Sequence, residues 1–379
     1  MRIARPVAGL LLGLSMLLNA APKSVYVYVG TYTNKGSKGI YAYKLDAAAG
    51  KLDSIGLVAE TPNPTFLAVH PSGKYLYAAN EIGNFNGQRT GSVTAYKIEP
   101  GGKLTQINAV SSKGSGPAHV TVDRAGHNVL VANYGGGSVA VLPIAGDGSL
   151  KEASAFVQHT GSSVNKSRQR EPHAHSVNVS RDNRFAIVAD LGLDKLLVYR
   201  LVSSTGALTP NDPPSVSTKP GAGPRHFAFH PKQQVAYSIN EIQSTVSVFD
   251  WDVRKGVLTE KQTLSTLPPD YKGEGNSTAE VVVHPNGKFL YGSNRGHDSV
   301  AIFSIGSDGR LTMVDVEPLG VKIPRNFAID PTGKYLFAEG QNSNQVKLFR
   351  IDAKTGKLTA TDTVVDIAAP VCIRFVAAK

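Results

Sequence analysis

The chain has 379 residues, of which 41% are hydrophobic and 18% are charged, with 38 glycines and 22 prolines. This composition is typical of a globular, turn-rich protein and excludes a mainly disordered or coiled-coil chain. The formal net charge of +11 is scattered through turns rather than gathered in aromatic-interleaved basic runs, which favours an anionic small ligand and argues against nucleic acid as a partner.

The first predicted element is a signal peptide over residues 1–21. Two arginines precede an apolar run from Val7 to Leu18, and small residues follow it. The run is shorter than a comfortable membrane span, so we predict cleavage and no membrane span afterwards; an uncleaved anchor is the alternative. We therefore expect an exported protein, periplasmic or secreted, in which residues 22–379 form a single domain.

The rest of the chain repeats one unit, marked by the triplet Gly-x-Leu. The seven triplets, about 50 residues apart, begin at Gly50, Gly102, Gly148, Gly206, Gly256, Gly309 and Gly356. Internal repetition at this period is typical of propellers and other repeat folds.

Each repeat contains the same order of short strands. In the first complete copy, two apolar strands at 66–69 and 75–80 flank a His-Pro-x-Gly-Lys turn, and a third strand at 92–97 precedes the next Gly-x-Leu. A weaker fourth strand follows. Runs of this length and composition between glycine, proline and asparagine clusters predict antiparallel hairpins. The sequence thus predicts an all-β, seven-bladed β-propeller with four antiparallel strands per blade, rather than an open β-solenoid.

The two ends of the chain are predicted to share one blade. A turn before the second strand can be aligned in six repeats, and the seventh repeat lacks it. Pairing of 371–376 with 25–30 would supply the missing inner strand and close the ring. The single cysteine, Cys372, cannot form an internal disulfide, so packing must stabilise the fold.

In such a blade, the residues before the innermost strand and after the second strand lie at the same end of the propeller. When the repeats are aligned, these positions differ from blade to blade, which turn geometry does not explain. They predict a pocket at the axial mouth lined by His119, His173, His175, Arg225, His226, Glu241, Arg295, Arg325 and Gln341. Guanidiniums match carboxylate or phosphate, and a histidine beside a glutamate can serve as a general base.

These residues also allow plainer interpretations. His119 could be a hydrogen-bonded core histidine, and the arginines could join blades through acidic neighbours or carbonyls. Spacing by two residues could let His173 and His175 bind a metal, but no cysteine or carboxylate cluster offers a clear third ligand, so we predict no metal. The chain also lacks a Gly-x-Ser-x-Gly elbow and a P-loop.

The most specific stretches are Glu-Pro-His-Ala-His-Ser-Val-Asn at 171–178, Gly-Ala-Gly-Pro-Arg-His at 221–226, Ser-Asn-Arg at 293–295 and Pro-Arg-Asn-Phe at 324–327. With them, the chain resembles the seven-bladed lactonase family, which includes propeller-type 6-phosphogluconolactonase and 3-carboxy-cis,cis-muconate cyclase. The resemblance covers the chain after the signal. It implies a catalytic set of His175, Glu241, Arg225 and Arg295.

The expected function is hydrolysis of a sugar lactone bearing an anionic group, as in conversion of 6-phospho-D-glucono-1,5-lactone to 6-phosphogluconate. His175 or Glu241 would activate water, and His173, His226, Arg325, His119 and Gln341 would contact substrate. We expect no cofactor and a monomer. Export conflicts with a cytosolic sugar-phosphate step, so another sugar lactone is also considered. A non-catalytic cell-envelope scaffold and a carboxymuconate cyclase are the alternatives.

Overall fold

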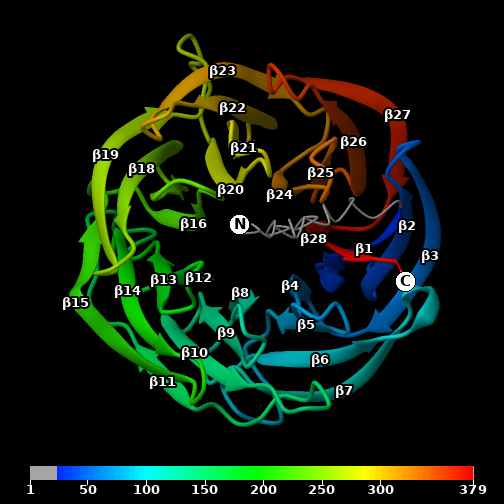
Figure 1. Ribbon diagram of the computed structural model, residues 1–379, viewed down its shortest axis with the longest axis vertical. Coiled ribbons are helices and arrows are strands. Elements are labelled where there is room, and N and C mark those ends of the chain that lie inside the picture. Colours follow the sequence, from blue (N-terminus) through cyan, green and yellow to red (C-terminus); the bar gives the residue numbers. More distant parts are fainter. Residues whose placement is uncertain (1–23, 379) are drawn as a thin grey trace, which may run out of the picture.

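The computed structural model describes residues 24–378 and places seven four-stranded antiparallel sheets in a ring around a central axis (Figure 1). The predicted seven-bladed β-propeller is therefore confirmed. The predicted signal peptide at 1–21 lies outside the described residues. Within residues 24–378, no helix has the length and apolar character needed to cross a membrane.

One blade combines both ends of the described chain. From the axis outward it contains β28 (Pro370–Ala377), β1 (Ser24–Thr31), β2 (Gly39–Asp46) and β3 (Lys51–Glu60). The other six blades follow in chain order, each with its first strand at the axis: β4 (Pro64–Val69), β5 (Tyr75–Asn80), β6 (Ser92–Ile98) and β7 (Leu104–Ser111); β8 (Pro117–Val122), β9 (Asn128–Asn133), β10 (Ser138–Pro143) and β11 (Ala155–Gln158); β12 (Ala174–Val179), β13 (Phe185–Asp190), β14 (Lys195–Val202) and β15 (Ala207–Ser217); β16 (Pro224–Phe229), β17 (Val235–Asn240), β18 (Thr245–Asp252) and β19 (Val257–Ser265); β20 (Ser277–Val283), β21 (Phe289–Arg295), β22 (Ser299–Ile305) and β23 (Leu311–Pro318); and β24 (Pro324–Ile329), β25 (Tyr335–Gly340), β26 (Gln345–Ile351) and β27 (Leu358–Asp366).

The closing blade forms as the sequence predicts. β28 pairs antiparallel with β1, and the register sets Val27 opposite Phe375 and Gly30 opposite Cys372. β28 also contacts the inner strands β4 and β24 of the neighbouring blades. The inner strands thus form a continuous ring, and this ring surrounds the axis on which the functional side chains meet.

The repeated Gly-x-Leu glycines sit in the turn between the third and fourth strands of each blade, where they contact a neighbouring blade. All seven have positive φ, between 69° and 86°, a region that side chains with a Cβ rarely adopt. Tyrosines on second strands donate hydrogen bonds to four of these glycine carbonyls, as Tyr77 does to Gly148 at 3.1 Å. The repeat therefore encodes both the turn and the contact between blades.

The histidines of the His-Pro-x-Gly turns have a similar role. In His70, His230 and His284, the ring Nε2 lies 2.8–3.0 Å from a carbonyl oxygen of the corresponding turn in the next blade. These histidines are on the face opposite the predicted mouth, so they belong to the scaffold.

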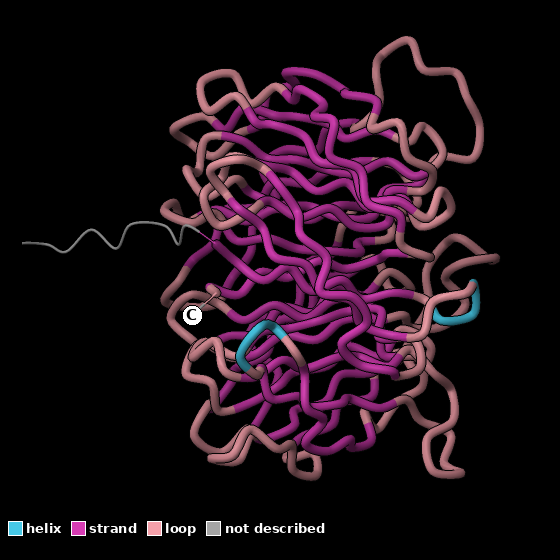
Figure 2. The backbone as a smooth tube through the Cα atoms, turned by 90° about the vertical axis from the view of Figure 1, so that its right-hand side faces the viewer, coloured by secondary structure: helices cyan, strands magenta, loops and turns pink. Residues whose placement is uncertain are grey.

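The two faces of the propeller differ in their connections. Figure 2 shows the strands running between two loop-bearing faces. The longest loop, 159–173, and two further long ones, 81–91 and 266–276, join outer or second strands at the mouth face. This face also carries the short 3-10 helix η1 (Thr33–Lys35), whereas η2 (Pro100–Gly102) lies on the opposite face with the inner hairpin turns.

Candidate active site

Three predicted site residues are placed by β-bulges at the start of inner strands. In β12, β16 and β24 the register shifts by one residue, so that His175, Arg225 and Arg325 are the unpaired extra residues. A bulge bends the strand and redirects a side chain, and bulges are frequent beside active sites. The bulges bring all three side chains to the mouth end of the axis.

The carboxylate of Glu241 forms the centre of the cluster. Its Oε2 lies 3.0 Å from Nε of Arg225 and 2.9 Å from an Nη atom of Arg295, while its Oε1 lies 2.5 Å from an Nη atom of Arg168. The Glu241 side chain is only 6% exposed, and that of Arg225 only 2%. Three of the four residues implied as catalytic are therefore in direct contact.

Backbone carbonyls hold the two buried guanidiniums from the other side. Arg225 donates to the carbonyl of Ala279 and Arg295 to that of Thr278, each at 2.7 Å. These carbonyls lie where β20 breaks register with β21. The arginines thus connect blades, which is the structural role considered for them in the sequence analysis. This role does not use every donor, because Nε of Arg295 is buried without a hydrogen-bond partner among the described residues.

A fourth guanidinium, that of Arg325, is not neutralised directly. It lies 5.5 Å from the centre of the Tyr32 ring and forms no ion pair within residues 24–378. The Tyr32 hydroxyl donates to Glu81 at 2.8 Å, and Glu81, Arg225 and Arg325 line the same narrow gap. Four guanidiniums facing two carboxylates leave the mouth with two excess positive charges, which suits an anionic ligand.

The cluster also determines the protonation states of Glu241 and His175. Burial raises the pKa of Glu241, but the guanidiniums of Arg295, Arg225 and Arg168 outweigh it and lower that pKa to about 2. Burial, with repulsion from Arg225, lowers the pKa of His175 well below its usual value. At neutral pH, Glu241 is therefore a carboxylate and His175 a neutral imidazole, with its buried Nδ1 unpartnered among the described residues.

Tyr134 links His175 to the arginine cluster. Its ring contacts that of His175 at 5.3 Å between centroids and stacks on His173 at 4.5 Å, and its hydroxyl accepts a hydrogen bond from Arg168 at 3.2 Å. Nδ1 of His173 also lies 3.0 Å from the carbonyl oxygen of Tyr134. Across residues 24–378, no three histidine, cysteine, aspartate or glutamate side chains are grouped closely enough to hold a metal.

A second layer lies directly beneath the mouth. His226 follows the bulge at Arg225, and its Nδ1 lies 2.8 Å from Oε1 of Glu280. The other oxygen of Glu280 accepts a hydrogen bond from Asn326. The ring of His119 packs 5.4 Å from that of His226 and 4.1 Å from that of Phe66. His226 and His119 are thus buried in this layer rather than exposed at the mouth.

A cavity on the opposite side of this layer has a volume of about 310 Å³. Its lining includes His119, His226, Glu280, Asn178 and Arg374. The mouth and the opposite face are thus separated along the axis by one layer of polar side chains.

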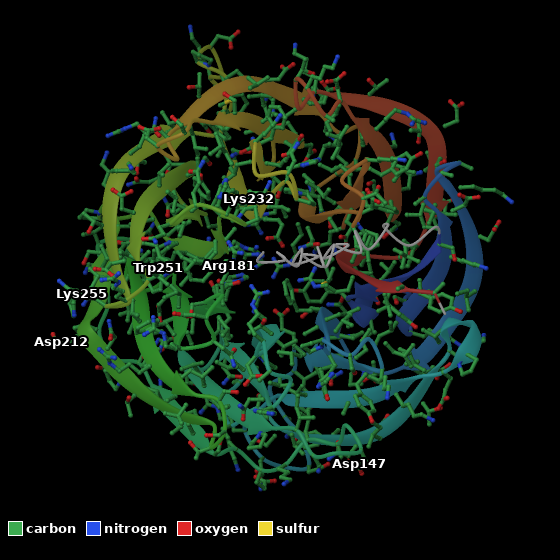
Figure 3. All side chains as sticks on the ribbon, in the orientation of Figure 1. Asp147, Arg181, Asp212, Lys232, Trp251 and Lys255 are labelled. Carbon is green, nitrogen blue, oxygen red and sulfur yellow. The ribbon has the colours of Figure 1, made fainter. Side chains whose placement is uncertain are left out.

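A cavity of about 350 Å³ lies farther from the axis on the same face. It is lined by Arg181, Lys232 and Trp251 among others. In Figure 3, Arg181 and Lys232 lie nearer the axis than Asp147, which is at the periphery. None of these side chains belongs to the mouth.

Two further residues of the mouth face, Gln341 and Arg168, differ from what the sequence predicts. Gln341 follows β25 at the mouth end, but within the described chain its side chain makes no hydrogen bond and its backbone N–H donates to Ile323. Arg168 was not predicted. It lies in the loop 159–173, outside the positions that aligning the repeats compares, and only the basic composition around it offers a signal.

Comparison with known proteins agrees with this architecture. The family model "Lactonase, 7-bladed beta-propeller" matches residues 26–375. The chain belongs to the seven-bladed β-propeller lactonase family. The predicted family and the predicted enzyme class, a lactonase-type carboxylic-ester hydrolase, are thereby confirmed.

Relatives of this lactonase family member align over most of their length. A Bacillus subtilis protein named 6-phosphogluconolactonase is 38% identical over 350 residues, which cover 92% of this chain and 97% of the relative. A Formosa agariphila protein of the same name is 34% identical, over 88% and 94% of the two chains. The solved structure of a Pseudomonas aeruginosa protein described as periplasmic gluconolactonase is 33% identical, with a TM-score of 0.88, and covers 94% of this chain and all of its own.

Proposed function

We propose that this lactonase hydrolyses a sugar lactone bearing an anionic group, of the 6-phosphogluconolactone type, at the axial mouth. The observation that carries the proposal is the excess of guanidiniums around Glu241 beside a neutral, buried His175. The names of the Bacillus subtilis and Formosa agariphila relatives support the same substrate class.

In this proposal the arginines bind charge in the substrate and in the transition state. Arg325 has no carboxylate partner among the described residues and would bind the phosphate or carboxylate. Arg295, whose buried Nε is unpartnered within the same part of the chain, would donate to the oxyanion that forms when water attacks the lactone carbonyl.

Of the two candidate bases, the geometry favours His175. Both oxygens of Glu241 are held by guanidiniums, which leaves neither oxygen free to accept a proton from water and suits Glu241 to orienting Arg225 and Arg295. His175 has a free ring nitrogen and would take a proton from water as the hydroxide oxygen bonds to the carbonyl carbon. The ring C–O bond then breaks, and His175 returns the proton to the leaving alkoxide.

Unphosphorylated glucono-1,5-lactone is a second candidate substrate. The description of the Pseudomonas aeruginosa relative favours it, as does the N-terminal segment, from which we propose export to the periplasm or the medium. The excess positive charge at the mouth argues for the anionic lactone instead.

The test is hydrolysis of both lactones by the full chain, after subtraction of spontaneous ring opening. We expect His175→Gln to lower kcat by about 100-fold or more. The exposed His127→Gln is the matched control and should keep the wild-type rate. An unchanged rate in His175→Gln would overturn the assignment of His175.

A further inference from the structure

We propose that His226 and Glu280 form a proton relay, which carries the proton released by hydrolysis from the mouth to the cavity on the opposite face. The proposal rests on the proposed function and adds two residues to it. His226 would accept the proton and Glu280 would position His226.

Hydrolysis at neutral pH requires such an exit. Lactone and water yield a hydroxy acid, which ionises, so each turnover produces one carboxylate and one proton. His175 takes one proton from the attacking water and returns it to the ring oxygen, which ends as a hydroxyl; the new carboxylic acid then gives its own proton to His175 and becomes the carboxylate. The net proton must then leave His175 before the next cycle, or His175 cannot act again as a base.

The mouth is a poor exit for this proton. Arg168, Arg225, Arg295 and Arg325 surround it, and their excess positive charge repels a protonated carrier. The bound product would also occupy the opening. The route away from these four guanidiniums leads down the axis, to a cavity lined by Glu280 as well as by Arg374.

His226 stands on that route with a free nitrogen. Its ring centroid lies 5.2 Å from that of His175. At this separation a proton can pass between the two rings directly or through one water molecule. Its Nε2 is buried and makes no hydrogen bond within the described chain, and the same holds for Nδ1 of His175. His226 also lines the narrow gap beneath Arg225 and Arg325, so it borders both the mouth and the layer below.

Glu280 fixes His226 as a proton acceptor. With Glu280 Oε1 2.8 Å from His226 Nδ1, the carboxylate accepts the Nδ1 proton, and this tautomer leaves Nε2 with its lone pair. The backbone N–H of Val281 donates to Oε1 at 3.0 Å, and Asn326 donates to Oε2. The negative charge stabilises the imidazolium that forms when Nε2 takes the proton.

The charges around His226 place it between two opposing influences. Burial disfavours protonation of His226, and so do Arg225 and Arg325 on the mouth side, whereas Glu280 on β20 favours it. The rings of His175, His119 and Phe66 pack around it. Protonated His226 is therefore a transient carrier that gives its proton up readily. Both His226 and Glu280 line the 310 Å³ cavity, where solvent can receive it.

The relay is tested by chemical rescue in the full-length protein with 6-phosphogluconolactone as substrate. We expect His226→Ala to lower kcat in dilute buffer by about tenfold to hundredfold, with KM within twofold of the wild type. Added imidazole should restore kcat in a saturable way, because it can enter the opened cavity and carry protons. His226→Gln keeps a hydrogen bond toward Glu280 but cannot carry a proton, so it should show the same loss without disturbing the fold.

Asn178→Ala is the matched control, because Asn178 lines the same cavity and has no ionisable group. It should keep the wild-type kcat and gain nothing from imidazole. Full activity of both His226 variants in dilute buffer, or a loss that imidazole does not restore in His226→Ala, would overturn the relay. A wild-type protein inactive on lactones would instead overturn the proposed function itself.

Discussion

Glu241 binds three guanidiniums with two oxygens, and this makes its charge important for stability as well as for the site. Its pKa of about 2 in the folded protein lies below the usual glutamate value of 4.5. The stabilisation is therefore fully present above pH 4.5 and is lost as the pH falls toward 2. When the pH is lowered from 5 to 3, we expect protonation of this single group to reduce the free energy of unfolding by about 2 kcal/mol.

Urea unfolding of Glu241→Gln at the two pH values measures this contribution. The variant should be less stable at pH 5 by about 3 kcal/mol, because buried guanidiniums lose their counter-charge, and its stability should vary less with pH. Glu152→Gln removes an exposed partner of Lys113 and should change little at either pH. Equal pH dependence in wild type and Glu241→Gln would contradict this account.

Arg325 is the residue expected to distinguish charged from neutral lactones. Arg325→Ala should raise KM for 6-phosphogluconolactone by about tenfold to hundredfold, the value of one or two charge-assisted hydrogen bonds. KM for glucono-1,5-lactone should change less than about threefold. Steady-state kinetics with both substrates tests this prediction, and the substitution Arg350→Ala at an exposed arginine is the control. An equal increase in KM for both lactones would show that Arg325 does not bind the phosphate.

Alignment of the repeats predicts most of the cluster. It compares equivalent positions, so it finds Arg225, Glu241 and Arg295 wherever they lie in the chain. It cannot find Arg168, which comes from a loop longer than its counterparts between the other blades. Alignment also does not distinguish residues at the mouth from residues in the second layer. Arg225 and His226 are adjacent in sequence, but the bulge in β16 places Arg225 at the mouth and His226 in the layer below.

The turn between the third and fourth strands of a blade is the element that the repeat predicts best, and glycine substitutions test it. At Gly256, φ is +70° and an added Cβ would overlap the Phe185 ring, so Gly256→Ala should lose about 3 kcal/mol or more from strain and overpacking. At Gly101, φ is +77° but no heavy atom lies within 4 Å of the Cβ position, so Gly101→Ala should lose only about 1 kcal/mol. Chemical denaturation gives both values; equal losses would mean that packing against Phe185 contributes nothing.

The strands themselves follow from short apolar runs between turn residues, and their order follows from hairpins of successive strands. The bulges at the starts of inner strands cannot be predicted from these apolar runs. A bulge adds one unpaired residue without a distinctive residue type, as the extra residues His175, Arg225 and Arg325 illustrate. The sequence pattern therefore predicts the strands but not the bulges that bring the site residues together.

Ring closure depends on β28, which carries the lone Cys372. Its thiol is buried beside the backbone of Leu67, and burial raises its pKa to about 12. If β28 detaches only when the whole ring opens, a thiol reagent should label Cys372 no faster than the protein unfolds globally. Labelling rates across urea concentrations, compared with unfolding followed by circular dichroism, test this; labelling far faster than unfolding would show that the closing strand opens alone.

The whole molecule brings Arg225, Glu241, Arg295 and Arg325 from three separate blades to one opening, and the account depends on that opening being where the anionic lactone binds. A crystal structure with bound 6-phosphogluconate, the reaction product, tests it most directly. We predict the phosphate against the Arg325 guanidinium and the new carboxylate within hydrogen-bonding distance of Arg295, with His175 beside the carboxylate carbon. Product bound elsewhere, with the arginine cluster unchanged and in contact only with Glu241, would contradict the account.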